Sequence, residues 1–261
     1  MHAFRIPGSN ASLCYHDIPG EEPALVFLHG LGGASSEGFL VIARHPLLAA
    51  SRIVLVDLLG FGYSDRPEAF GYSMEEHADS VAALLEHLGL FGCRVIGHSM
   101  GGSIAILLAF RFPSLVSALV VAEGNLDPGK GGISLQIAAQ PEEVFIREGH
   151  ATLMHDLKGW LDATPAYGGA FRAVQGASPQ AIYRSAQSLL AARQPTLRQA
   201  LEQLAIPRTY LIGERSLPGF PEGPAPANGV EVAYVADAGH LMNADNPDGF
   251  ACAIAHAFGM G

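Results

Sequence analysis

The stretch Arg94-Val-Ile-Gly-His-Ser-Met-Gly-Gly102 joins an apolar run to a helix-like segment and contains the pattern G-x-S-x-G. Where a strand passes directly into a helix through this pattern, the chain makes a sharp turn that exposes the serine side chain above the sheet. Side chains two residues before and after the serine would collide in so tight a turn, which accounts for Gly97 and Gly101. The stretch therefore predicts a strand, a helix and a nucleophilic serine at Ser99.

Outward from this turn, apolar runs alternate with amphipathic segments, a rhythm typical of a mostly parallel sheet covered by helices. Several runs are apolar throughout, as expected of strands that are buried on both faces. The expected strands are Ser12–His16, Ala24–Leu28, Arg52–Val56, Arg94–Gly97, Ala118–Ala122, Thr209–Ile212 and Val230–Val235. The expected core helices are Ser73–Leu88, Ser99–Phe112 and Asn246–Phe258.

The middle of the chain lacks strand-like runs. It contains helical patterns at Glu142–Leu157, Pro179–Arg193 and Thr196–Leu204, with breaks expected at Pro165, Gly168-Gly169 and Pro179. We therefore expect residues 1–126 and 205–261 to form the core and residues 127–204 to form a helical lid inserted between two strands. A Pro/Gly-rich loop is expected at Leu217–Gly229.

Two further segments carry groups that a nucleophilic serine needs. His29-Gly-Leu-Gly-Gly33 follows an apolar strand, and a Gly-rich turn there can direct the Leu31 N–H inward, as one of two donors to an oxyanion. The Met100 N–H, directly after the nucleophile, would be the second donor. His240 lies in the Gly-containing loop after the last expected strand, where a base able to deprotonate Ser99 is required.

With these motifs in this order, the sequence resembles the α/β-hydrolase fold superfamily of serine hydrolases, in its lid-bearing form. The resemblance runs from about Ala24 to the end of the chain and is weakest in the lid. It implies an α/β fold with a mostly parallel eight-stranded sheet, flanking helices and the inserted lid. It also implies that Asp57 has a structural role.

The acid of the expected triad departs from the family pattern. The family usually places it after the penultimate strand, where this chain has Ser216. A minority of members place it after the sixth strand, and here the residue that follows that apolar run is Glu123. A carboxylate at the end of a fully apolar strand needs a partner such as a histidine, so Glu123 is the expected acid, with Asp127 and Glu214 as alternatives.

The resulting hypothesis is an enzyme that cleaves a carboxylic ester or a lactone through an acyl-enzyme, with no cofactor and no metal. Aromatic and apolar lid residues favour a small-molecule substrate with an apolar or aromatic group; they are Phe145, Met154, Trp160, Tyr167, Phe171 and Tyr183. C–C bond hydrolysis and cofactor-free perhydrolysis use the same triad and remain alternatives. A ligand-binding homologue without turnover is a further alternative.

Charge and composition limit the partners. The formal net charge of the chain is −10, and only 15 of its 261 residues are Lys or Arg, so a nucleic acid or an anionic membrane surface is not expected to bind. The first residues contain no apolar segment of the kind that begins a secretory signal, and three scattered cysteines do not make a disulfide framework. A cytoplasmic protein is expected. The oligomeric state cannot be derived from the sequence.

Overall fold

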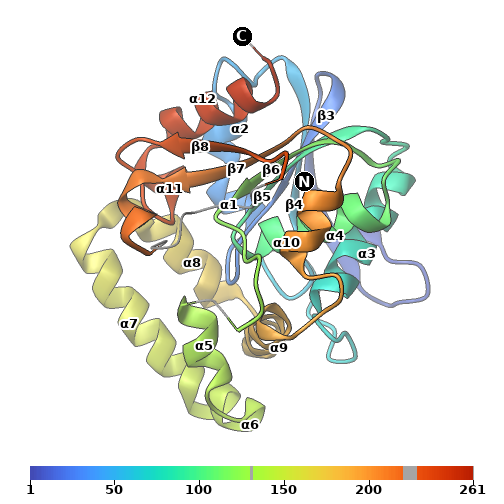
Figure 1. The fold of residues 1–261 in the computed structure, drawn as a ribbon. Coiled ribbons are helices and arrows are strands. Elements are labelled where there is room, and N and C mark those ends of the chain that lie inside the picture. The colour runs from blue at the N-terminus through green and yellow to red at the C-terminus, as the bar shows by residue number, and fades with distance from the viewer. Residues whose placement is uncertain (130–131, 220–227, 261) are drawn as a thin grey trace.

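An eight-stranded sheet forms the centre of the protein in the computed structural model, which describes residues 1–129, 132–219 and 228–260 (Figure 1). The strand order is β1-β2-β4-β3-β5-β6-β7-β8; the two pairings β1–β2 and β2–β4 are antiparallel and the others parallel. The strands are β1 His2–Arg5, β2 Ser12–Ile18, β3 Glu21–Leu28, β4 Ser51–Asp57, β5 Cys93–His98, β6 Val116–Ala122, β7 Arg208–Gly213 and β8 Glu231–Val235. The expected mostly parallel sheet is confirmed, and β1 adds an edge strand that the apolar pattern did not indicate.

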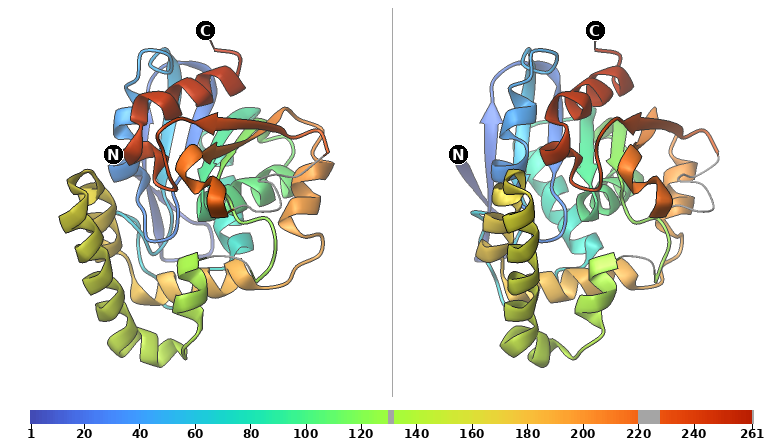
Figure 2. Two further views of the ribbon diagram at one scale, coloured as in Figure 1. Left: turned by 60° about the vertical axis from the view of Figure 1, so that its left-hand side comes forward. Right: turned by 90° about the vertical axis from the view of Figure 1, so that its left-hand side faces the viewer.

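Helices cover both faces of this sheet, as Figures 1 and 2 show. On one face lie α3 (Met74–His87), α4 (Met100–Arg111) and α10 (Leu197–Gln203), and on the other α2 (Leu40–Ala43) and α12 (Pro247–Ala257). Two single-turn helices, α1 (Ser35–Gly38) and α11 (Met242–Asp245), complete this part of the chain. Each face of the sheet buries its own cluster of apolar side chains. Strands that helices cover on both faces carry apolar side chains on both faces.

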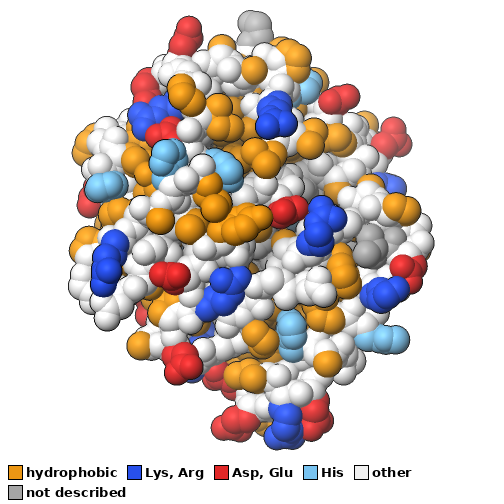
Figure 3. Space-filling model, turned by 180° about the vertical axis from the view of Figure 1, so that it is seen from behind, with side chains coloured by type: hydrophobic (Ala, Val, Ile, Leu, Met, Phe, Trp, Pro, Cys, Tyr) orange, Lys and Arg blue, Asp and Glu red, His pale blue; other side chains and the backbone are white. Residues whose placement is uncertain are grey.

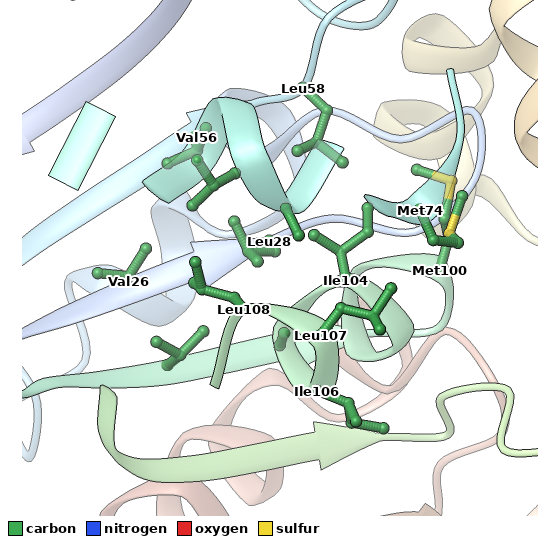
Figure 4. Close-up of a cluster of buried hydrophobic side chains, with 14 of the residues drawn as sticks. Val26, Leu28, Val56, Leu58, Met74, Met100, Ile104, Ile106, Leu107 and Leu108 are labelled. Carbon is green, nitrogen blue, oxygen red and sulfur yellow. The ribbon is translucent and has the colours of Figure 1, made fainter. Parts of the chain in front are cut away.

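The expected core helices are present, and α3 and α12 begin directly after capping residues. Ser73 caps α3 in a reciprocal capping box with Glu76, and Asn246 caps α12 just before Pro247. Helix α4 is apolar nearly all round because it packs between the sheet and α3. Figure 4 shows Ile104 and Leu108 of α4 beside Leu28 of β3.

Between β6 and β7 the chain leaves the sheet and forms a group of helices, here called the cap helices. They are α5 (Gly132–Ala138), α6 (Glu142–Val144), the π-helical turn Phe145–Gly149, α7 (His150–Ala163), the 3₁₀ turn Pro165–Tyr167, α8 (Gly168–Gly176) and α9 (Pro179–Leu190). They project from one end of the sheet in Figures 1 and 2, whereas α10 packs back onto α4.

Two expectations for this segment were wrong. The single helix expected over Glu142–Leu157 is divided by the π-helical turn, and Gly168-Gly169 begins α8 instead of ending a helix. The break expected at Pro165 is confirmed, since α7 ends at Ala163 and proline has no N–H to continue the helix. Apolar spacing alone does not reveal a one-residue change of helical register.

The remaining expectations concern loops and surface. A 3₁₀ turn spans Glu214–Gly219, and most of the expected Pro/Gly-rich loop, residues 220–227, lies outside the described residues. On the face seen in Figure 3, Lys and Arg side chains are scattered among acidic and apolar ones. Among the described residues, every helix is too short or too polar to cross a bilayer.

Candidate active site

Ser99 sits on the turn between β5 and α4, at the carboxyl end of the sheet. Its backbone is held at φ 52°, a conformation that non-glycine residues rarely adopt and that lifts the side chain out of the strand path. A Cβ on Gly97 would lie 2.3 Å from the Gly101 carbonyl oxygen, and a Cβ on Gly101 would lie 2.2 Å from that of Leu28. The two glycines are therefore required by backbone contact. Ser99 is partly exposed and lines a cavity.

The turn that carries Leu31 packs directly against the serine. The His29 imidazole fixes it from within, since Nε2 accepts from the Leu58 N–H at 3.0 Å and Nδ1 donates to the Gly30 carbonyl oxygen at 2.8 Å. A Cβ on Gly30 would lie 3.1 Å from the Ser99 Cβ. The structure thus brings Leu31 and Ser99 to the same cavity, next to the first N–H group of α4, that of Met100, which has no acceptor within the helix.

His240 and Glu123 meet at the same end of the sheet. The His240 Nδ1 and Glu123 Oε2 atoms are 2.7 Å apart, and Glu123 Oε1 accepts from the Gly213 N–H at 2.9 Å. The Glu123 side chain is 5% exposed and that of His240 51%. Glu123 follows β6 with φ 47°, which turns its side chain towards β7 and the His240 loop.

Opposing effects act on the Glu123 carboxyl. Burial raises its pKa, but the hydrogen bond and charge of His240, the Gly213 N–H and the Ser216 hydroxyl together outweigh burial and hold the pKa below its usual value. Glu123 is therefore ionised at neutral pH. An ionised carboxylate on Nδ1 fixes the tautomer of His240 and leaves Nε2 as the nitrogen that can accept a proton.

The alternative carboxylates make other contacts. Asp127 makes a two-bond ion pair with Arg198, whose Nε and terminal nitrogen are 2.9 and 2.8 Å from its oxygens. Glu214 is exposed to solvent. Ser216, which occupies the position of the family's usual acid, instead contacts the carboxylate of Glu123.

Sequence reasoning did not single out Asp245, although this residue organises the His240 loop. One carboxylate oxygen accepts from the Gly239 N–H at 2.8 Å and lies 3.0 Å from Arg215, and the other accepts from the Tyr167 hydroxyl at 2.8 Å. Its side chain is 6% exposed. Asp245 thus joins the loop of the candidate base to the cap helices. No sequence signal pairs it with Tyr167, which is 78 residues away.

His98 was also missed. Its ring is buried, lies 4.9 Å from the His240 ring between centroids, and donates from Nε2 to the His240 backbone carbonyl at 2.7 Å. Burial, together with the nearby His240, lowers the pKa of His98 to about 3, so the ring is neutral. Its position beside Ser99 in the motif was the available signal.

A cavity of about 1570 Å³ connects these groups to the cap helices. Three of the predicted aromatic residues, Trp160, Tyr167 and Phe171, line it, whereas Phe145 and Tyr183 are buried in packing contacts. Among the described residues that line the cavity, the only Arg or Lys side chains are Arg198 and Arg215, and each is paired with an aspartate. Four carboxylates, those of Glu37, Glu123, Asp127 and Asp245, line the same cavity, so its lining is acidic as well as largely apolar.

Comparison with known proteins indicates the family to which the chain belongs. A family model described as the alpha/beta hydrolase fold matches residues 23–155, just over half of the chain. The 2-hydroxymuconate semialdehyde hydrolase of Pseudomonas putida is 32% identical over 147 residues, which cover 56% of this chain and 49% of the relative. The chain spans about half, or less, of the length of the curated relatives it matches.

Solved structures share the whole fold. A carboxylesterase structure from Nitrososphaera gargenis has a TM-score of 0.80 at 20% identity, covering 99% of this chain and 98% of that one. The enol-lactonase of Burkholderia xenovorans has a TM-score of 0.78 at 18% identity, covering 99% and 100%. By its family match and its sheet, the chain belongs to the alpha/beta hydrolase fold family.

Proposed function

We propose that the protein is a serine hydrolase that cleaves a carboxylic ester or lactone through an acyl-enzyme. The observation that carries the proposal is the 2.7 Å contact between His240 Nδ1 and Glu123 Oε2, at a cavity that Ser99 also lines. A buried carboxylate on one nitrogen of an imidazole, at a cavity that a serine on a tight turn also lines, is consistent with the arrangement that activates a hydroxyl.

The mechanism assigns one step to each group. His240 Nε2 takes the proton of Ser99 as its oxygen attacks the ester carbonyl, and the Leu31 and Met100 N–H groups stabilise the resulting oxyanion. His240 then returns the proton to the leaving alcohol as the acyl-enzyme forms. In the second half, His240 deprotonates a water that attacks the acyl-enzyme and then protonates Ser99. Glu123 stays ionised and stabilises the imidazolium in both halves.

The cavity favours a neutral substrate. Both arginines that line it are already paired with aspartates, and the remaining lining is mostly apolar. An anionic substrate would have to compete with those aspartates for a guanidinium. Because the cap helices form one wall, they would act as the lid, narrower than residues 127–204 since α10 packs on α4. Carboxylesterase and lactonase structures among the solved relatives agree with an ester or a lactone as the substrate.

Hydrolysis of nitrophenyl acetate and butyrate tests the proposal. Ser99→Ala should lower kcat by a factor on the order of 10⁴–10⁶, because the nucleophile is lost. Glu123→Gln should lower it by a factor on the order of 10⁴, since the imidazolium loses its counter-charge. Asp127→Asn is the matched control, a second cavity carboxylate that is paired with Arg198, and should cost less than about tenfold.

Two results would contradict the assignment. Turnover by Ser99→Ala within a factor of about 100 of the wild type would show that Ser99 is not the nucleophile. A larger loss with Asp127→Asn than with Glu123→Gln would show that Asp127 is the acid.

A further inference from the structure

The peptide group between Ala238 and Gly239, one residue before His240, is held at both of its polar atoms. Its carbonyl oxygen accepts from the Arg215 N–H at 2.8 Å. Its N–H donates to a carboxylate oxygen of Asp245, also at 2.8 Å. The backbone that leads into the candidate base is therefore fixed by two other segments of the chain.

The placement of the His240 ring depends on this backbone. The hydrogen bond between Nδ1 and Glu123 fixes one side of the ring, but 51% of the side chain is exposed, so packing restrains the ring only in part. The loop before it contains Asp237 at φ 53°, a conformation that non-glycine residues keep only where their surroundings hold them. The position of Nε2 thus follows from where the loop places the His240 α-carbon.

Asp245 is built to hold this loop. It ends the single turn of α11, and its side chain is 6% exposed, so both carboxylate oxygens need partners. Oδ2 accepts from the Gly239 N–H and lies 3.0 Å from an Arg215 nitrogen. Oδ1 accepts from the Tyr167 hydroxyl at 2.8 Å. One carboxylate therefore bonds the loop of the base with one oxygen and the cap helices with the other.

Tyr167 belongs to the 3₁₀ turn between α7 and α8. Figure 1 shows α11 beside the end of the cap where α7 passes into α8. Burial and the hydrogen bond to Asp245 raise the pKa of Tyr167, so its hydroxyl keeps its proton and donates. A second contact joins this end of the cap to the core, between Arg172 and Glu37 at 3.4 Å. Arg172 is 65% exposed, and exposed ion pairs contribute little, so the bond to the buried carboxylate is the stronger link.

We propose that Asp245 is a positioning residue for His240, and that the Tyr167 hydroxyl couples this positioning to the packing of the cap helices against the core. With the cap packed, both oxygens of Asp245 are bonded, and the backbone before His240 is held where proton transfer from Ser99 requires it. When the cap moves away, Oδ1 loses its donor, the carboxylate can turn, and the Gly239 N–H loses a fixed acceptor. The inference rests on the proposed function, because it takes His240 as the base.

The ring of His240 can be observed without turnover. In protein labelled with nitrogen-15 at histidine, its ring signals are assigned by their loss in His240→Gln. Tyr167→Phe should shift or broaden these signals, and Asp245→Asn should do so more strongly, because each removes a contact that holds the loop. Arg172→Gln is the matched control, since it removes the other cap contact and should leave the signals unchanged. Unchanged His240 signals in Tyr167→Phe would overturn the coupling, and unchanged signals in Asp245→Asn would overturn the positioning role.

A double-mutant cycle on nitrophenyl acetate hydrolysis tests how Tyr167 acts. Tyr167→Phe should lower kcat about tenfold, with KM changed less than about twofold, because the hydroxyl acts on the base and not on the bound ester. Asp245→Ala should lower kcat about 100-fold, the cost of a displacement of about 1 Å at a catalytic group. In the Asp245→Ala protein, Tyr167→Phe should change kcat less than about twofold. Losses that simply multiply would show that Tyr167 does not act through Asp245.

The inference and the proposed function fail separately. Turnover that survives Ser99→Ala would contradict the proposed function. Wild-type kcat in Tyr167→Phe, with turnover still abolished by Ser99→Ala, would contradict the coupling alone. Near-ultraviolet dichroism shows whether Asp245→Ala folds. If it does not, Tyr167→Phe, which removes a single hydroxyl, decides the coupling, and the His240 signals of Asp245→Asn decide the positioning role.

Discussion

Buried histidines should make the stability of the protein fall as the pH is lowered. His77 of α3 is fully buried among Phe61, Phe70 and Tyr72, and its Nε2 lies 3.3 Å from the Ser185 hydroxyl. Among the described residues, its Nδ1 has no hydrogen-bond partner. Burial, with a small contribution from the charge of His29, lowers the pKa of His77 to about 3.

The sign and size of the effect follow from the two pKa values. The unfolded chain binds a proton at His77 below pH 6.5, whereas the folded protein does so only near pH 3. The contribution to stability is therefore complete above pH 6.5 and is lost progressively as the pH falls towards 3. At pH 5, which is 1.5 units below the unfolded value, His77 costs about 2 kcal/mol. His98, whose pKa is also lowered to about 3, costs about as much.

The perturbation is His77→Gln, which removes one titrating group from the folded core. Urea unfolding, followed by circular dichroism at pH 8 and pH 5, gives the free energy of unfolding at both. Between these pH values the wild type should lose about 2 kcal/mol more than the variant, whatever the variant loses at pH 8. The control His155→Gln, at an exposed position of α7, should lose as much as the wild type. An equal loss in His77→Gln and the wild type would refute the reasoning.

Three further predictions concern the candidate site. Gly101→Ala should prevent accumulation of folded protein, because its Cβ would lie 2.2 Å from a backbone oxygen; a normal near-ultraviolet dichroism spectrum would contradict this. Ser216→Ala should lower kcat by about tenfold, because it removes a hydrogen bond from the Glu123 carboxylate, and Ser216→Thr should restore kcat. An unchanged kcat in Ser216→Ala would show that this hydrogen bond does not contribute to catalysis. Asp245→Asn should lower kcat more than Tyr167→Phe, because Asp245 also accepts a hydrogen bond from the Gly239 N–H. Equal losses in the two variants would show that Asp245 acts only through its hydrogen bond with Tyr167 of the cap helices.

The sequence was informative where local backbone geometry dictates residue type. Gly97, Ser99 and Gly101 indicate a sharp turn that few other residues can form. A Cβ at either glycine would collide with backbone atoms, and Ser99 has a positive φ. The central strands were equally clear, because burial on both faces favours continuous runs of apolar residues in them. Strand β1 was not, since it lies at the edge and buries only Phe4 of its four residues.

Long-range contacts could not be predicted in the same way. A carboxylate at the end of an apolar strand needs a partner, so a partner for Glu123 could be predicted. The fold brings that partner, His240, from 117 residues away. The contact between Tyr167 and Asp245 had no local signal at all. The cap helices were indicated only coarsely, because the division of one helix into three segments depends on packing and not on apolar spacing.

Active-site labelling tests the central claim most directly. A fluorophosphonate should add one adduct per chain, and peptide mapping should place it on Ser99, because only a serine activated by a neighbouring base reacts with it quickly. Glu123→Gln should label much more slowly, and Ser99→Ala should not label. An adduct on another serine, or an unlabelled wild-type protein, would contradict the assignment of Ser99, His240 and Glu123 as a catalytic triad.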